Sequence, residues 1–385
     1  MRRYRRTLIT AALVAGMAGS TAGWAVGGAQ RAVTGPPPGS AAWRADGSLG
    51  RALPDPATAS PYEVAAFYAT LTPAERRELT RRHPTVVGNL DGAPVGQRYE
   101  ANDLAIRATH DPRFARLTEP GRQILAFDPR GRGQVAEVYG DLTADGHIAV
   151  VVPGADIDLN SFDRRRDPYG TPAGMAASLR KAAGGRIATV AWTGYTTPVG
   201  VGVDAAMGDL AVAGAERLTR FTQGLVAIGA GKPALFCHSY GSVVCGLAAK
   251  EVNARDIVAF GSPGMRANTV ADLGTRARVW AAKDTTDWIS KVPNVEFAGL
   301  GHGTDPADKA FGARRVPATS AHGHTGYFAP GTDSLDAFVD IARGRIRRDG
   351  PGPGTETAEA AEAAETSEAA ETAEAYPAAA PGRPR

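Results

Sequence analysis

The sequence predicts an α/β fold with a mostly parallel sheet, helices on both sheet faces, and antiparallel strands at one edge. After Gly154, continuous apolar runs such as "RIATVAW" and "DIVAFG" alternate with helical segments, the pattern of strands buried on both faces. Before Gly154, the turn signals "RGRG" and "ADG" separate three strand-like runs, which predicts an antiparallel meander entering the sheet. We assign this domain to residues 121–348.

The first segment, residues 1–29, predicts a signal peptide or an N-terminal membrane anchor. Four arginines among the first six residues precede an uncharged stretch from Thr7 to Ala29. Gly27 and Ala29 supply the small side chains that a cleavage site requires, although the stretch is also long enough to cross a bilayer. We therefore expect a secreted or extracytoplasmic protein, with membrane contact only through this segment if it is retained.

Two further segments have biased compositions. Residues 30–59 are rich in Pro, Gly and Ala and lack an apolar period, which predicts an extended linker. Residues 349–385 are rich in Ala and Glu, with glutamate at every third position from 356 to 374, which predicts a disordered tail. The formal net charge is only +3, so the composition does not indicate a nucleic-acid partner.

Residues 60–120 predict a helical segment packed ahead of the sheet. Ser60 and Thr72 are each followed by proline, which is favoured in the first turn of a helix, and Glu75 is a capping-box partner for Thr72. This segment contains no group of residues typical of a catalytic site. With the sheet and helices that follow, the order of elements is that expected of an α/β-hydrolase fold.

The stretch "CHSYGSVVCG" predicts a nucleophile at Ser239. It lies between the apolar run "PALFC" and a helix, where a sharp strand-to-helix turn exposes the serine. Such a turn requires small residues two positions before and after the serine; Gly241 meets this requirement and Cys237 meets it in part. Ser262 lies in the turn "GSPGM", and we do not expect it to be a second nucleophile.

The acid and the base should follow the serine in that order. Asp284 and Asp287 both follow the strand "RVWAA", and we choose Asp287 because the apolar Ile289 can anchor its loop. His324 is our choice of base because it precedes the final helix, with His302 and His322 as alternatives. We expect His238 to point away from the serine and to have a packing role.

The oxyanion of the transition state needs two amide donors. We expect one from Tyr240, which follows the nucleophile, and the other from Gly154 or Ala155, after the strand "HIAVVV". Cys237 and Cys245 are the only cysteines, and their spacing allows either a disulfide or two buried thiols. No metal-ligand spacing occurs, and we expect no metal or cofactor.

An ordered set of blocks supports this interpretation. The blocks "VVPGADIDLNSF", "VAWTGYTTP", "HSYGSVV", "FGSPGM" and "HGHTGYF" resemble those of an actinobacterial α/β-hydrolase family catalogued as a domain of unknown function. The resemblance runs from about residue 62 to 344. It implies the α/β-hydrolase fold and, by motif, Ser239 as nucleophile with His324 and Asp287 as partners. It implies no substrate, and Cys237 replaces the glycine that commonly begins the elbow of this family.

These observations predict an exported serine hydrolase, esterase-like or lipase-like, that cleaves a small-molecule or lipid-like acyl substrate through an acyl-enzyme on Ser239. An acyltransferase of the cell envelope is one alternative, since the sequence does not distinguish water from an alcohol as acceptor. A catalytically silent binding module with the same fold is the other.

Overall fold

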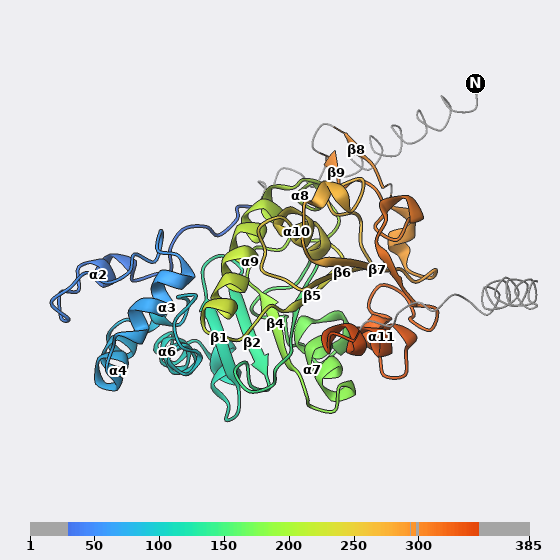
Figure 1. Ribbon diagram of the computed structural model, residues 1–385. Helices are drawn as coiled ribbons and strands as arrows, with labels where there is room; N and C mark the ends of the chain where they lie inside the picture. The colour runs from blue at the N-terminus through green and yellow to red at the C-terminus, as the bar shows by residue number, and fades with distance from the viewer. Residues whose placement is uncertain (1–29, 293, 298–299, 346–385) are drawn as a thin grey trace, which may run out of the picture. The chain divides into compact units, whose positions relative to one another are not determined.

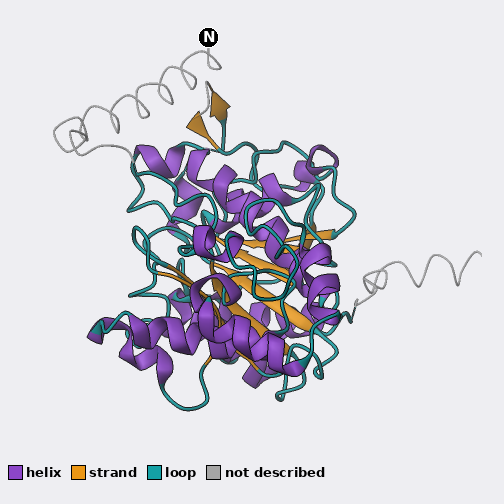
Figure 2. Cartoon of the chain, turned by 90° about the vertical axis from the view of Figure 1, so that its left-hand side faces the viewer, coloured by secondary structure: helices purple, strands orange, loops and turns teal. Residues whose placement is uncertain are grey.

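The central feature of the fold is an eight-stranded mixed sheet with the strand order β1-β2-β4-β3-β5-β6-β7-β10 (Figures 1 and 2). The computed structural model describes residues 30–292, 294–297 and 300–345. The strands of this sheet are β1 (Gln123–Asp128), β2 (Gln134–Tyr139), β3 (Ile148–Val152), β4 (Ala188–Thr193), β5 (Ala234–His238), β6 (Asp256–Phe260), β7 (Arg278–Ala282) and β10 (Arg314–Val316).

The directions of the strands confirm the predicted sheet. β1 is antiparallel to β2 and β2 is antiparallel to β4, whereas all the other neighbours are parallel. The predicted meander is wrong in one respect, because β3 does not pair with β2. Instead, β4 lies between them and β3 pairs with β4 and β5, so the chain crosses over through a helix before β4.

Helices surround the sheet on both faces, as Figure 2 shows. They are α2 (Ser40–Arg44), α3 (Pro61–Ala69), α4 (Pro73–Arg82), α5 (Pro84–Val87), α6 (Val95–Ala108), α7 (Pro172–Ala182), α8 (Val203–Ala206), α9 (Asp209–Ala227), α10 (Gly241–Ala248) and α11 (Asp333–Ala342). The predicted helical starts are confirmed at α3 and α4, where Ser60 with Glu63 and Thr72 with Glu75 form capping boxes.

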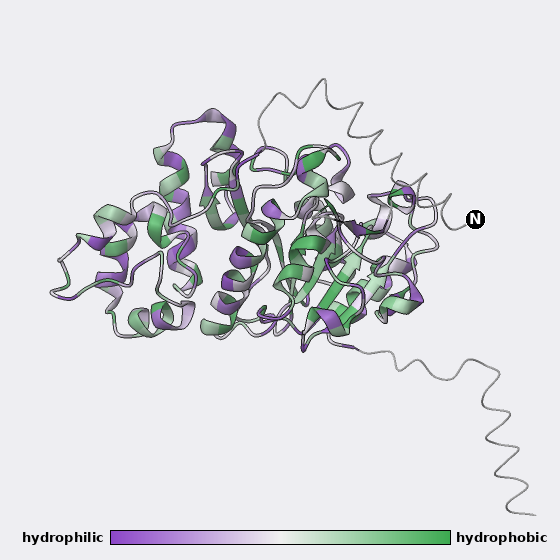
Figure 3. Ribbon diagram, turned by 90° about the horizontal axis from the view of Figure 1, so that it is seen from above, coloured by the Kyte–Doolittle hydropathy of each residue, from purple (hydrophilic) through white to green (hydrophobic). Residues whose placement is uncertain are grey.

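Two hydrophobic clusters sandwich the sheet. In β3, Val151 belongs to the cluster that contains Leu179 of α7 and Phe338 of α11. The adjacent Val150 belongs to the cluster that contains Phe221 of α9, because successive side chains of a strand point to opposite faces. The strands are accordingly coloured as hydrophobic along most of their length, whereas the helices around them carry both colours (Figure 3).

Residues 30–59 differ from the predicted extended linker. This segment contains α2, and Trp43 is fully buried in a third hydrophobic cluster with Val64 and Leu79. Gln30 and Val33 form four hydrogen bonds to the segment after β4. The amide of Gln30 donates to Asp204, and its side chain donates to the carbonyl of Thr197 and accepts from the amide of Val199. The amide of Val33 donates to the hydroxyl of Thr196. The segment therefore packs on the domain, since a packed tryptophan outweighs a proline-rich composition.

The described residues up to Gly344 form one compact unit. The predicted signal peptide or anchor and the predicted tail both lie outside the described residues. Within the described ranges, no helix combines the length and the apolar character that a membrane span needs. A small additional sheet, β8 (Glu296–Phe297) and β9 (Leu300–Gly301), lies between β7 and β10 in the chain and was not expected from the sequence.

Candidate active site

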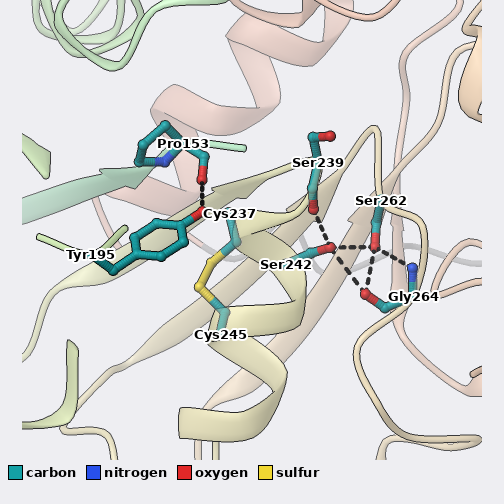
Figure 4. The surroundings of a disulfide bond; sticks show 8 residues. All are labelled: Pro153, Tyr195, Cys237, Ser239, Ser242, Cys245, Ser262 and Gly264. Atoms are coloured by element: carbon teal, nitrogen blue, oxygen red, sulfur yellow. Dashed lines mark hydrogen bonds between the residues drawn. A yellow bond between two sulfur atoms is a disulfide. The ribbon is translucent and has the colours of Figure 1, made fainter. Parts of the chain in front are cut away.

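The predicted nucleophile Ser239 occupies a sharp turn between β5 and α10. Its φ is 51°, a left-handed conformation that costs energy for a residue with a side chain and that is held only by its surroundings. Its amide donates to the carbonyl of Phe260 at 3.0 Å, and its carbonyl accepts from the Ser242 hydroxyl at 2.6 Å. Figure 4 shows the Ser239 hydroxyl pointing away from the hydrogen-bonded cluster of Ser242, Ser262 and Gly264.

Two glycines allow this turn to lie close to the end of β3. A Cβ added at Gly241 would stand 2.5 Å from the carbonyl oxygen of Val152, and one added at Gly154 would stand 2.6 Å from Cβ of Ser239. Both distances are shorter than van der Waals contact, so neither position accepts a larger residue without movement. The close backbone approach therefore explains why position 241 needs a small residue, as the sequence suggested, and it imposes the same requirement on position 154.

At the third small position, Cys237 forms a disulfide with Cys245 (Figure 4). The Cα atoms are 6.4 Å apart, and both side chains are fully buried in the cluster beneath α9 and α10. The bridge therefore joins the end of β5 to α10, and Ser239 lies in the loop that it closes. Of the two states that the sequence left open, the structure contains the disulfide.

Asp287 and His324 form a hydrogen-bonded pair. Nδ1 of His324 donates to the Asp287 carboxylate, at 2.9 Å from Oδ1 and 3.1 Å from Oδ2. The carboxylate also accepts from the amide of Ile289 at 2.9 Å and from the hydroxyl of Tyr327 at 2.8 Å. Burial disfavours its charged form, but these hydrogen bonds, with that of His324 the largest, hold the pKa of Asp287 below its ordinary value.

Gly261 lies between the nucleophile turn and this pair. A Cβ added there would stand 3.0 Å from Oδ2 of Asp287 and 3.2 Å from Nδ1 of His324, and the preceding Phe260 accepts the amide hydrogen bond of Ser239. Among the described residues, no hydrogen bond joins the Ser239 hydroxyl to His324. Catalytic hydrogen bonds are often long in structures without substrate and tighten when it binds.

Two residues have a positioning role that the sequence did not reveal: His238, for which we expected only packing, and Tyr327. The ring of His238 lies 4.6 Å from that of His324, and its Nε2 donates to the His324 carbonyl at 2.8 Å. Burial lowers the pKa of His238 to about 3, so it is a neutral donor that fastens the His324 loop beside the nucleophile. Tyr327 holds Asp287 in the same way. Adjacency to Ser239 was the only sequence signal for His238, and Tyr327 offered none beyond its closeness to His324.

The alternative residues occupy other positions. Asp284 is buried and accepts from the amide of Gly323 at 3.0 Å, so it orders the loop that carries His324. His322 is exposed. His302 contacts other segments. Its Nε2 donates to the carbonyl of Ala205 at 2.7 Å, and its ring packs edge-on against the ring of Tyr240, with 5.6 Å between the ring centroids. Neither His302 nor His322 contacts Asp287.

The predicted oxyanion donors lie beside Ser239. Within the described ranges, the backbone amides of Tyr240, Gly154 and Ala155 donate to no acceptor, which leaves them available for a developing negative charge. Asp156, the next residue, turns the chain away with a φ of 64°. As for metals, the described residues contain no group of three or more His, Cys, Asp or Glu side chains that could hold an ion.

The strand order and the turn at Ser239 define a protein with the α/β-hydrolase fold. A family model described as "Alpha/beta hydrolase" matches residues 128–297, which covers β2 to β7 and the nucleophile turn. The fold predicted from the sequence is thus confirmed.

Two curated proteins of Mycobacterium tuberculosis are similar to this chain, "Uncharacterized protein MT2140" of strain CDC 1551 / Oshkosh and "Uncharacterized protein Rv2079" of strain ATCC 25618 / H37Rv. Each is 28% identical over 387 residues, covering 76% of this chain and 57% of the relative. The chain therefore matches little more than half the length of these relatives.

Solved structures are similar at a lower level. The α/β serine hydrolase without lid, XC6422 from Xanthomonas campestris, is 18% identical with a TM-score of 0.33 and covers 60% of this chain and 97% of its own. The esterase domain of a Rhodothermus marinus protein is 16% identical with a TM-score of 0.33, covering 56% and 93%. Both values are low, and the fold assignment rests on the strand order and the family match.

Proposed function

We propose that this protein is a serine hydrolase that cleaves an ester or related acyl substrate through an acyl-enzyme on Ser239. The observation that carries the proposal is the hydrogen-bonded pair of Asp287 and His324 beside a serine in a left-handed turn. Catalysis of this kind needs a nucleophile, a base and an acid that orients the base, each carried by a separate loop. Here the nucleophile follows β5, the acid follows β7 and the base follows β10.

Each residue has a definite role in the proposed reaction. The Ser239 oxygen attacks the substrate carbonyl as His324 Nε2 takes its proton, and Asp287 holds the imidazole in the tautomer with hydrogen on Nδ1. The amides of Tyr240 and of the Gly154–Ala155 turn bind the oxyanion. His324 then returns the proton to the leaving group, and water releases the acyl group by the reverse sequence. The substrate is an acyl compound, and the expected partners include no nucleic acid.

Residues that precede the described part complete the proposal. The predicted export signal or anchor would place the enzyme outside the cytoplasm, where a disulfide persists. The Cys237–Cys245 bridge is consistent with such a compartment. The expected placement in an actinobacterial hydrolase family accords with the similarity to the two mycobacterial proteins.

Labelling by a fluorophosphonate tests the proposal. The full chain should be labelled and should hydrolyse p-nitrophenyl acetate, and Ser239→Ala should abolish both. Ser262→Ala is the matched control, because Ser262 is the neighbouring buried serine whose hydroxyl bonds to Ser242 at 2.6 Å; this variant should retain labelling. A folded wild-type protein that shows neither labelling nor turnover would instead favour the catalytically silent binding module. Transfer of the acyl group to an added alcohol would indicate an acyltransferase.

A further inference from the structure

Exposed hydrophobic side chains are concentrated in two segments. Of the ten large hydrophobic residues that are exposed among the described residues, eight lie in residues 199–212 and 288–300. Scattered exposed hydrophobics are ordinary, whereas a concentration of them marks a binding surface. The eight residues, which we call the apolar rim, are Val199, Val201, Val203, Met207, Val212, Trp288, Val295 and Leu300.

The first segment of the apolar rim is hydrogen-bonded to Asp156, which follows the proposed donors Gly154 and Ala155, and to the side chain of Tyr240. The amide of Asp156 donates to the carbonyl of Pro198 at 2.9 Å, and the amide of Gly200 donates to Oδ1 of Asp156 at 2.8 Å. On the other side of the nucleophile, the Tyr240 hydroxyl donates to the carbonyl of Met207 at 3.0 Å. The chain from 198 to 207 therefore flanks the position that a substrate carbonyl would occupy.

The second segment of the apolar rim begins at the proposed base. The ring of Trp288 lies 4.7 Å from that of His324 and is 41% exposed. The two segments also meet each other: His302 donates to Ala205, and Arg266 both pairs with Glu296 at 3.0 Å and lies 3.0 Å from a Cβ added at Gly208. In Figure 1, α8 accordingly lies beside β9.

Charge is scarce along the apolar rim. Residues 199–212 contain only Asp204 and Asp209, and residues 288–300 contain only Lys291 and Glu296. Asp204 accepts from the amide of Gln30, and Glu296 is paired with Arg266. The stretch from Val199 to Val203 contains no charged side chain. A surface of this kind gains free energy when it covers apolar area and offers little to an anionic or strongly polar group. Its preferred occupant is therefore an aliphatic chain.

We infer that the substrate is an ester with a long aliphatic acyl chain, and that this chain lies along Val199, Val201 and Val203. The inference rests on the proposed function. The leaving oxygen must face His324 to receive its proton, so the acyl chain extends to the other side of the carbonyl, where the segment 198–207 adjoins the oxyanion donors. Trp288 then faces the leaving group.

A chain-length series tests the inference. We would measure kcat/KM of the full chain for p-nitrophenyl acetate, butyrate, octanoate and laurate below their aggregation concentrations. Octanoate should exceed acetate by about tenfold or more, since each covered methylene adds about a fourfold gain at most. The double variant Val201→Ser/Val203→Ser should lose about tenfold for octanoate and stay within about twofold of wild type for acetate. Both valines are at least half exposed, so the fold does not depend on them.

The control and the contrary outcomes are distinct. Leu247→Ser truncates an exposed side chain outside the apolar rim and should leave the whole series unchanged. Equal rates for all chain lengths, or equal losses for acetate and octanoate in the double variant, would overturn the inference while leaving serine hydrolysis intact. A gain that appears only above the aggregation concentration would also overturn it, in favour of docking on a lipid surface. If no ester is cleaved and Ser239 is not labelled, the proposed function fails and the inference fails with it.

Discussion

Removal of the Cys237–Cys245 disulfide should destabilise the fold and slow the reaction at Ser239 together. The bridge closes a short loop with a sequence separation of 8, and this loop contains the nucleophile turn. The loop-closure entropy for that length corresponds to about 2.5 kcal/mol at 25 °C. For roughly 300 folded residues, this free energy of unfolding is equivalent to a fall of about 4 °C in Tm.

The activity should fall as well, because the bridge constrains Ser239 in its left-handed conformation. With a φ of 51°, this residue stores about 1–3 kcal/mol of backbone strain that its surroundings must hold. Without the bridge, part of the population relaxes and the Ser239 hydroxyl leaves its position beside Gly154. We expect kcat for p-nitrophenyl acetate to fall about tenfold or more, with KM nearly unchanged.

The assay compares wild type with Cys237→Ala/Cys245→Ala by thermal unfolding and by steady-state kinetics. Alanine is preferred to serine because both sites are fully buried and a hydroxyl there would lack a partner. Wild type treated with a reductant under native conditions is the control and should keep its Tm, since the sulfurs are inaccessible. A double variant with wild-type Tm and wild-type kcat would refute the reasoning.

Three other changes have definite expected outcomes. Gly154→Ala should lower kcat about a hundredfold and also lower the Tm, because its Cβ would stand 2.6 Å from that of Ser239 and the turn would have to move. Unchanged kcat would contradict the close approach. Tyr327→Phe removes a hydrogen bond to Asp287, so the pKa of that carboxyl should rise. In a pH profile, kcat/KM should therefore fall about tenfold at pH 5 but less at pH 8. Burial lowers the pKa of His302 to about 4, so the unfolded chain binds a proton that the folded chain does not; stability should be full above pH 6.5 and fall by up to about 3 kcal/mol as the pH drops toward 4. His302→Gln should flatten this decline in thermal unfolding, and an equally steep decline would count against it.

The sequence contained enough local information to locate the candidate site. Strand β5, the turn at Ser239 and helix α10 are contiguous, so periodicity and the small-residue requirement were sufficient to find them. The choice of Asp287 and His324 depended on the order of loops after β7 and β10, which the parallel alternation of the sheet makes regular. Their mutual hydrogen bond is what that order predicts.

Features that depend on contacts between distant segments were not accessible. The position of β4 between β2 and β3 depends on how all the strands pair in the sheet. Because β2, β3 and β4 are similarly apolar, their sequences do not indicate which of them are neighbours. The donor role of His238 arises because the loop of His324 passes over it, 86 residues later in the chain. Trp43 was overlooked for a similar reason: a single tryptophan in a proline-rich stretch has no period, and only its burial reveals that the segment packs.

The contacts of Gln30 tie a loop beside the proposed active site to residues 30–59. Four hydrogen bonds join Gln30 and Val33 to residues 196–204, more than 160 positions away. A truncated protein that starts at Ser60 would lose these bonds together with the Trp43 packing. We expect its stability and its substrate range to change together although every proposed catalytic residue is intact, so residues 30–59 belong to the folded domain and not to a separable linker.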